Sequence, residues 1–198
     1  MSERILIIDF GSQVTQLIAR RVRESGVYSE IHPFNSITTE TISSFDPKGV
    51  ILSGGPDSIN DKDTPRAPEG LFNMGLPILG ICYGQMAMAE ALGGEIVSSA
   101  QREFGRAFLN ITGDCELFRD VWAVGSREEV WMSHGDEVVA LPPGFEILAS
   151  TPDWGFSEEY CQCPERLAGA FDDGLSDGDA LISPTAEATI VIRTAGRL

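Results

Sequence analysis

The stretch Leu79-Gly80-Ile81-Cys82-Tyr83-Gly84 ends a short apolar run and precedes a helix-like segment. A nucleophile on a sharp strand-to-helix turn, flanked by glycines, is a recurrent arrangement in α/β enzymes. The helix that starts behind Cys82 favours the thiolate over the thiol. The alternative is a buried structural cysteine, which is the ordinary fate of this residue type. The flanking glycines favour the first interpretation, so the stretch predicts an α/β fold that presents a reactive cysteine.

Apolar runs and helical periodicity alternate along the first half of the chain. A continuous apolar run typical of a buried parallel strand covers residues 5–8, and further strands are predicted at residues 27–34, 49–53 and 77–81. This alternation predicts a doubly wound, mostly parallel sheet with helices on both faces, a flavodoxin-like three-layer α/β fold. From Glu95 to Ser150 the pattern becomes β-rich, with strand candidates at residues 107–111, 130–132 and 145–149.

The first helix is predicted to follow the strand at residues 5–8. Ser12 is expected to cap it, because a serine hydroxyl can accept a hydrogen bond from the first-turn amides. Gly26 is expected to end it. Its apolar face is predicted to consist of Val14, Leu17, Ile18 and Val22. Further helices are predicted over residues 39–45, 71–75 and 84–92.

Tight turns follow three of the predicted strands, at Gly11, at Gly54-Gly55 and at Cys82. Parallel sheets bind ligands outside the carboxyl ends of their strands, so these turns are expected at one edge. Alone, the diglycine would be an ordinary turn. Beside Cys82 it can bring a backbone amide to an oxyanion, and the Tyr83 amide is a second donor. The predicted chemistry is attack on an amide or ester carbonyl through a covalent acyl intermediate.

The composition excludes several classes of partner. The 198 residues carry 30 acidic and 14 basic side chains, a net charge of −16. Such a polyanion is unsuited to nucleic acid or anionic membrane, because phosphate contacts need clustered Lys and Arg. No apolar run is long enough to span a bilayer. The sequence also has neither a metal-ligand cluster nor a Walker-type phosphate loop, so no metal or cofactor is expected in this chain.

The amino terminus and the cysteines indicate the compartment. Residues 1–4 lead directly into the first strand, so no signal peptide is expected. The spacing of the cysteine pair near residue 162 fits neither a zinc knuckle nor a redox pair. A reducing cytoplasm is the simplest location for the four thiols, Cys82, Cys115, Cys161 and Cys163.

Five motifs occur in the order and spacing of one enzyme family. They are Ile-Ile-Asp-Phe-Gly-Ser-Gln at 7–13, Leu-Ser-Gly-Gly-Pro at 52–56, Gly-Ile-Cys-Tyr-Gly-Gln at 80–85, Arg-Glu-Phe-Gly at 102–105 and Val-Trp-Met-Ser-His-Gly-Asp at 130–136. The chain thereby resembles the class I (triad-type) glutamine amidotransferases. The last motif is characteristic of the GMP synthetase group within them. The resemblance covers residues 1–153, which are the predicted amidotransferase domain.

The resemblance implies a reaction and a partner. Cys82 would be the nucleophile that splits glutamine into glutamate and ammonia. Gly54, Gly55 and the Tyr83 amide would surround the oxyanion. The ammonia would pass to an ATP-pyrophosphatase (synthetase) domain or subunit, which aminates adenylylated xanthosine monophosphate to GMP. ATP and magnesium would belong to that module and not to this chain.

The resemblance also implies a binding site for glutamine. A loop of Ser133, His134 and Gly135 would hold the backbone of the substrate. Gln85 is also assigned to the residues that bind glutamine. Its neighbour Met86 occupies a position where the family has Gln or Glu in contact with the substrate, so substrate affinity is expected to be reduced.

Residues 154–198 depart from the family. The family has a His-Pro-Glu run after its cysteine, as base and orienting group, whereas this chain has only His32 and His134. His134 is not expected to reach Cys82 in a productive geometry. The departure is abrupt, which predicts a frame-shifted or otherwise substituted acidic end, or a poorly ordered tail. Without the base, turnover is expected to fall by several orders of magnitude.

Two other functions stay open. The chain could be a catalytically silent amidotransferase-like module that binds glutamine or a synthetase and regulates it. It could also be another cysteine hydrolase on the same scaffold, although the motif at 130–136 argues against this.

Asp9 ends the first strand, a common place for functional side chains, and capping of the next turn explains it equally well.

Overall fold

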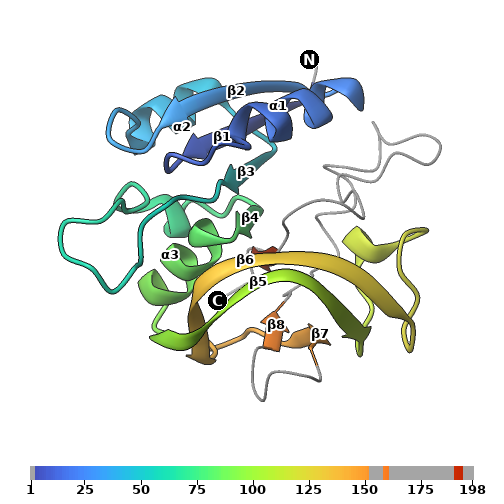
Figure 1. The fold of residues 1–198 in the computed structure, drawn as a ribbon. Helices are drawn as coiled ribbons and strands as arrows, with labels where there is room; N and C mark the ends of the chain where they lie inside the picture. The colour runs from blue at the N-terminus through green and yellow to red at the C-terminus, as the bar shows by residue number, and fades with distance from the viewer. Residues whose placement is uncertain (1–2, 152–157, 161–189, 194–198) are drawn as a thin grey trace.

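A five-stranded sheet forms the centre of the fold (Figure 1). The computed structural model describes residues 3–151, 158–160 and 190–193. The strand order is β2-β1-β3-β4-β9, with β1 (Arg4–Asp9), β2 (Tyr28–Pro33), β3 (Gly49–Leu52), β4 (Ile78–Ile81) and β9 (Ile190–Arg193). The first four strands are parallel, and β9 pairs antiparallel with β4. The predicted doubly wound α/β sheet is confirmed.

Helices cover both faces of this sheet because the side chains of β1 alternate between them. Ile5 and Ile7 share a core with α1 (Thr15–Glu24). Leu6 and Ile8 share another with α2 (Thr39–Phe45) and α3 (Tyr83–Ala91). All four β1 side chains are fully buried, as expected for a strand covered on both faces.

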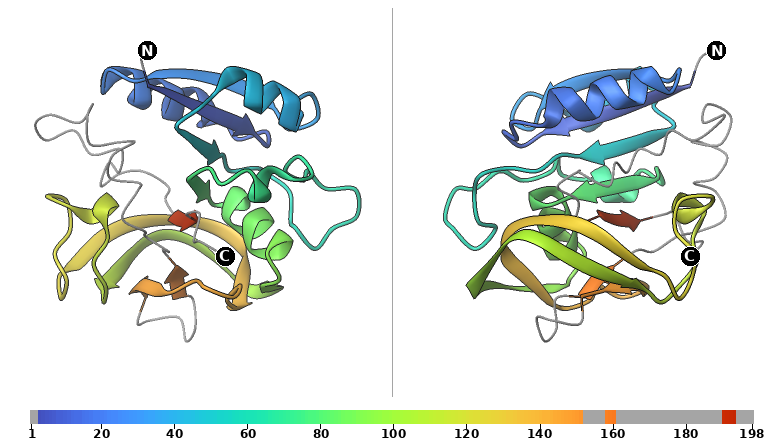
Figure 2. Two further views of the ribbon diagram at one scale, coloured as in Figure 1. Left: turned by 180° about the vertical axis from the view of Figure 1, so that it is seen from behind. Right: turned by 45° about the vertical axis from the view of Figure 1, so that its right-hand side comes forward.

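A second, antiparallel sheet packs against the first (Figures 1 and 2). Its order is β6-β5-β7-β8, with β5 (Glu95–Ile111), β6 (Arg127–Ala140), β7 (Ile147–Ser150) and β8 (Glu158–Tyr160). Leu109 and Leu148 of this sheet lie in the same core as α1. The β-rich second half is therefore confirmed. Two of its strands are much longer than the runs predicted at 107–111 and 130–132, because β5 and β6 pair through polar residues as well.

The start of α1 differs from its prediction. The helix begins at Thr15 after Val14, and Ser12 accepts a hydrogen bond from the Val14 amide (3.2 Å) in the preceding turn. Ser12 as the cap is therefore wrong, because its hydroxyl stabilises the turn that leads into the helix. Leu17 on the buried face is also wrong, since this side chain is 50% exposed. The predicted end at Gly26 is confirmed by its positive φ of 81°.

Several shorter elements complete the fold. The helix predicted over 39–45 is confirmed as α2, that over 71–75 is a 3₁₀ turn at Leu71–Asn73, and a second such turn covers Glu116–Phe118. Of the segment 154–198 only residues 158–160 and 190–193 are described. The predictions for the rest lie outside the described residues, whereas Ile190–Arg193 forms β9.

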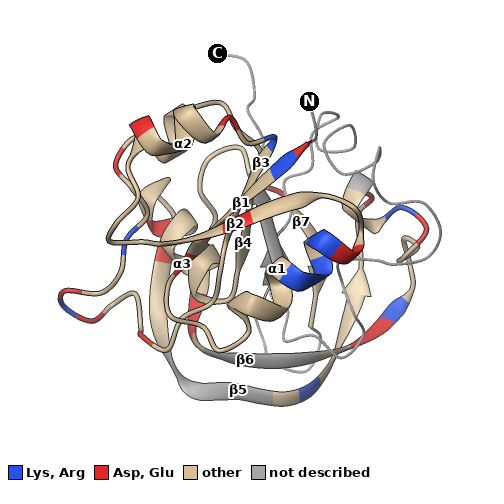
Figure 3. Cartoon of the chain, turned by 90° about the horizontal axis from the view of Figure 1, so that it is seen from above, with Lys and Arg blue, Asp and Glu red and all other residues tan. Residues whose placement is uncertain are grey.

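Charged side chains are unevenly distributed over the described surface (Figure 3). The exposed side of α1 carries arginines in a chain that is otherwise acidic. Arg20 and Arg21 both bind Glu24, at 2.7 and 3.1 Å. Among the residues that the structure describes, no helix has the length and apolar character needed to cross a membrane.

Candidate active site

Cys82 occupies the single residue between β4 and α3. Its backbone has φ 54° and ψ −117°, in a region that residues other than glycine seldom adopt. Such a conformation costs about 1–3 kcal/mol and persists only where the surrounding structure enforces it. The Cys82 side chain is partly exposed. The predicted sharp strand-to-helix turn is therefore confirmed in its backbone geometry.

Two glycines allow this turn to form. A Cβ atom on Gly84 would overlap the carbonyl of Leu52, the last residue of β3. A Cβ atom on Gly80 would lie 2.8 Å from the backbone nitrogen of Gln85. The first turn of α3 thus lies directly against the backbones of β3 and β4. This close packing fixes the direction in which Cys82 leaves the sheet.

The diglycine turn lies beside Cys82. A Cβ atom built on Gly54 would lie 3.4 Å from Cys82 Cβ and 3.5 Å from Ser12 Oγ. A Cβ on Gly55 would lie 2.8 Å from the carbonyl oxygen of Phe10, which excludes any larger residue there. The turns after β1, β3 and β4 therefore converge, as predicted. Ser12 was not assigned to the site from the sequence, although it lies within the motif at 7–13.

Asp9 organises the turn that follows β1. Its Oδ1 atom accepts hydrogen bonds from the Gly11 amide (2.9 Å) and the Thr15 hydroxyl (2.8 Å). The Phe10 amide donates to Ser53 Oγ (3.0 Å), which ties this turn to the end of β3. These bonds give Asp9 the structural role that capping of the turn predicts.

Tyr83 anchors the start of α3. Its side chain is 4% exposed and packs edge-on against Phe10, with ring centroids 5.4 Å apart. Its hydroxyl donates to the Pro65 carbonyl and accepts from Arg66 Nη1 (3.2 Å). Burial raises the pKa of Tyr83 above its ordinary value of 10.0. The Tyr83 amide lies in the first turn of α3, where backbone N–H groups have no acceptor within the helix and can bind an anion.

The segment predicted to hold the glutamine backbone is a strand and not a loop. Ser133 and His134 pair with Phe104 and Glu103 within the β5–β6 ribbon, and Gly135 continues the same strand. The loop prediction was wrong because backbone pairing with β5 holds the polar residues Ser133 and His134 in a strand. The side chains of Ser133 and His134 lie outside the described ones, so their roles stay predictions.

Gln85 and Met86 both lie on α3 in the interior. Gln85 is 2% exposed, and within the described residues its Oε1 atom has no hydrogen-bond partner. Met86 is 4% exposed and belongs to the apolar core that also contains Leu52 and Ile78. The effect of Met86 on glutamine affinity stays a prediction. No group of three or more metal-ligating side chains occurs within the part of the chain that the structure describes.

The family model "Glutamine amidotransferase class-I" matches residues 6–167. The chain belongs to this family. The GMP synthase [glutamine-hydrolyzing] of Allorhizobium ampelinum is 57% identical over 155 residues, which are 78% of this chain and 30% of that protein. The protein of the same name from Bradyrhizobium diazoefficiens is 54% identical, over 78% of this chain and 28% of that protein. The chain thus spans less than a third of the length of these curated relatives.

Solved structures agree with this assignment. A protein from Thermoplasma acidophilum, described as a GMP synthase subunit, superposes with a TM-score of 0.67 at 30% identity, covering 77% of this chain and 74% of that one. A glutamine amidotransferase from Thermotoga maritima superposes with a TM-score of 0.62 at 17% identity, covering 87% and 84%. At that identity the second likeness supports the fold alone.

Proposed function

We propose that this chain is the glutamine amidotransferase part of a GMP synthase, and that Cys82 is its nucleophile. The observation that carries the proposal is the positive-φ backbone of Cys82 between β4 and α3, next to Gly54. Nucleophile turns of this kind need the strained backbone and the close glycine contacts together. The identity to proteins named GMP synthase supports the choice of glutamine as substrate.

The proposed reaction passes through a thioester. The Cys82 thiolate attacks the side-chain amide carbon of glutamine and forms a tetrahedral intermediate. The N–H groups of Gly55 and Tyr83 donate to its negatively charged oxygen. The C–N bond then breaks, and the departing nitrogen takes a proton and leaves as ammonia. Water attacks the thioester, which releases glutamate and restores the thiol.

The proposed partner is an ATP-pyrophosphatase (synthetase) domain or subunit that takes up the ammonia. ATP and magnesium would be bound by this partner, and the proposed location of the pair is the cytoplasm. Two observations support such a domain or subunit. The chain covers 30% of its relative from Allorhizobium ampelinum, and the solved protein from Thermoplasma acidophilum is described as one subunit.

Slow turnover is part of the proposal. The sequence contains no histidine after His134. The histidine that the family uses as base and acid is therefore missing from its usual place. Without an acid, protonation of the leaving ammonia depends on solvent, and kcat is expected to be lower by several orders of magnitude. The same observation favours a second candidate, a catalytically silent module that binds glutamine or the synthetase.

A glutamine-shaped diazoketone and a turnover assay distinguish the candidates. The purified chain is incubated with the diazoketone, or with iodoacetamide, and Cys82 is located by peptide mass. Ammonia release from glutamine is measured with and without the synthetase domain of a related GMP synthase. Labelling of Cys82 by the diazoketone, with slow ammonia release that Cys82→Ala abolishes, supports the glutaminase. Labelling by iodoacetamide alone, with synthetase binding unchanged in Cys82→Ala, contradicts it and favours the silent module.

A further inference from the structure

Asp136 on β6 holds the loop that follows the diglycine turn. Asp136 is 7% exposed, and three donors converge on its carboxyl group. Oδ1 accepts from Ser58 Oγ (2.8 Å) and from Ser98 Oγ (3.2 Å), and Oδ2 accepts from the Ile59 amide (2.9 Å). Ser98 is the cross-strand partner of Asp136 on β5. We call these four residues the Asp136 cluster.

Hydrogen bonds from neutral groups stabilise this buried carboxylate. None of the ion pairs between described residues includes Asp136. A buried charge without a cation costs free energy unless donors surround it, and bonds to a carboxylate are stronger than those between neutral groups. The convergence of three donors therefore explains how a carboxyl group is accommodated in the interior at this position of β6.

The loop is anchored a second time at Ile59. The Ile59 carbonyl accepts from Arg66 Nη2 (2.9 Å), so both peptide groups of Ile59 are held. The Ile59 side chain is 3% exposed within the α3 core. Arg66 also donates to the Tyr83 hydroxyl (3.2 Å). The loop is thereby fixed both to β6 and to the start of α3.

The Asp136 cluster lies close to the diglycine turn along the chain. Ser58 follows Gly55 by three residues, and the intervening Pro56 has a fixed φ. Only Pro56 and Asp57 separate Ser58 from the diglycine turn, so a shift of Ser58 can be transmitted to this turn. On the other side, Asp136 directly follows Gly135 in the segment predicted to hold the substrate.

We propose that Asp136 is a positioning residue for the glutaminase reaction, which holds the Gly54-Gly55 turn against Cys82. This role rests on the proposed function. An oxyanion donor acts mainly in the transition state, so its displacement lowers kcat and leaves KM nearly unchanged. Asp136→Ala is expected to lower acylation of Cys82 about tenfold to a hundredfold, because misplacement by about 1 Å can cost a hundredfold.

The acylation assay uses a γ-glutamyl p-nitrophenyl ester. Its leaving group departs as an anion and needs no acid, so the lack of an acid does not hide the effect. Asp136→Asn should retain most of the rate, because its carbonyl can accept from Ile59 while its amide donates to the two hydroxyls. Ser58→Ala should lose about threefold, since one of three bonds is removed. Alkylation of Cys82 by iodoacetamide needs no oxyanion donor and should change less than twofold in Asp136→Ala.

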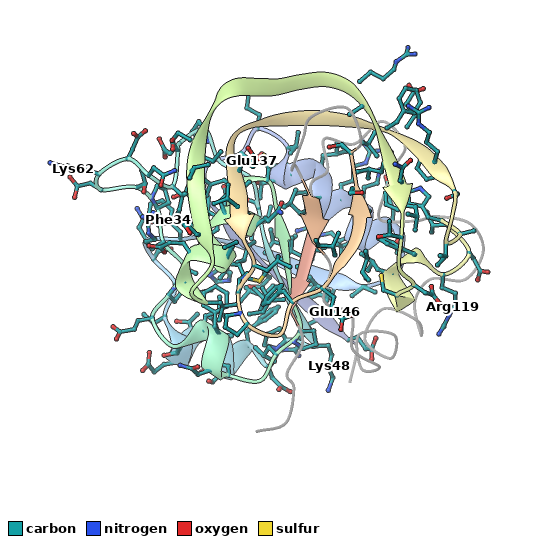
Figure 4. The ribbon with its side chains drawn as sticks, turned by 90° about the horizontal axis from the view of Figure 1, so that it is seen from below. Phe34, Lys48, Lys62, Arg119, Glu137 and Glu146 are labelled. Carbon is teal, nitrogen blue, oxygen red and sulfur yellow. The ribbon has the colours of Figure 1, made fainter. Side chains whose placement is uncertain are left out.

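Proteolysis after Lys62 reports on the loop without any activity. Lys62 is exposed at the tip of the loop (Figure 4), and a lysine-specific protease can cleave there. Asp136→Ala should be cleaved at least about tenfold faster than the wild type, because the anchored loop must open for cleavage. Asp136→Asn should be cleaved at the wild-type rate. Asp61→Ala is the matched control, since it removes an exposed carboxylate from the same loop.

The outcomes separate the two proposals. The positioning role is supported if the ester acylates the wild type and if Asp136→Ala is acylated more slowly and cleaved faster than the wild type. Unchanged acylation in Asp136→Ala, or unchanged cleavage, overturns this role and leaves the glutaminase intact. A wild type that iodoacetamide labels but the ester does not acylate overturns the glutaminase, and the positioning role with it. If Asp136→Ala does not fold, Ser58→Ala gives the same comparison.

Discussion

Gly84 in the first turn of α3 touches the carbonyl group of Leu52 so closely that no side chain fits between them. The contact joins two backbones, so no rotation of a side chain can relieve an added atom. It brings the helix start against the end of β3 and gives Cys82 its strained conformation. The reactive turn therefore depends on a contact that includes neither the cysteine nor the substrate.

Gly84→Ala should destabilise the fold and disturb the turn. The added methyl group overlaps the Leu52 carbonyl, and overpacking of this kind costs about 1–3 kcal/mol or more. Urea unfolding followed by circular dichroism gives the change. The control is Gly26→Ala, where the new Cβ has open space but a positive φ, with an expected cost of about 1 kcal/mol. Equal losses in the two variants would contradict the steric role.

Cys82 should react with iodoacetamide much faster than Cys115. Cys82 is partly exposed at the start of α3, where the helix dipole favours its thiolate, whereas Cys115 is 7% exposed in the core. We expect a difference of at least about tenfold, because the thiolate is the reacting species. Peptide mass spectrometry at short labelling times measures both rates. Equal rates would count against the proposed nucleophile.

Asp9→Ala should destabilise the chain while Asp9→Asn should not. Alanine removes the acceptor of the Gly11 amide and of the Thr15 hydroxyl, at a cost of about 1–3 kcal/mol. Asparagine retains an oxygen at the Oδ1 position and is expected to stay within about 0.5 kcal/mol. Thermal unfolding measures both changes. Equal destabilisation by both substitutions would show that the charge, and not the acceptor geometry, is what matters.

Tyr83→Phe should reduce the loss of stability at alkaline pH. Burial raises the pKa of Tyr83 above 10.0, so the folded chain binds the phenol proton more tightly than the unfolded chain. The unfolding free energy therefore decreases as the pH rises above 10.0 and through the folded pKa. Urea unfolding between pH 9 and 11 measures this slope, which should be shallower in the variant. At pH 7 the substitution should cost about 1 kcal/mol, for the lost hydrogen bond. Identical slopes would contradict the prediction.

The sequence predicted the central sheet and the reactive turn because both depend on local signals. The centres of β1, β3 and β4 are apolar runs, and the turn at Cys82 is marked by Gly80 and Gly84. Where pairing with a distant strand holds polar residues in a sheet, no local sequence pattern predicts the strand. This is the case for Ser133 and His134, which were expected in a loop and lie in β6.

Other parts of the site depend on contacts between distant residues. Asp136 bonds to Ile59, and Arg66 bonds to both Ile59 and Tyr83, and these pairs have no periodic pattern along the chain. Asp136 lies in the motif at 130–136, which indicates a functional segment but does not identify the hydrogen-bond partners of Asp136. The α1 errors have a similar cause. Leu17 fits the apolar periodicity, but packing against the sheet buries Ala19 beside the predicted Val22 and leaves Leu17 exposed.

The position of β9 links the reactive strand to the last part of the chain. Because β9 pairs with β4, the strand that ends at Cys82 lacks one neighbour until residues 190–193 have been synthesised. A nascent chain shorter than this presents Ile78–Ile81 as an open edge of apolar residues. Open edges recruit strands from other molecules, so interrupted translation would yield an aggregation-prone product even though every element around the cysteine is already present.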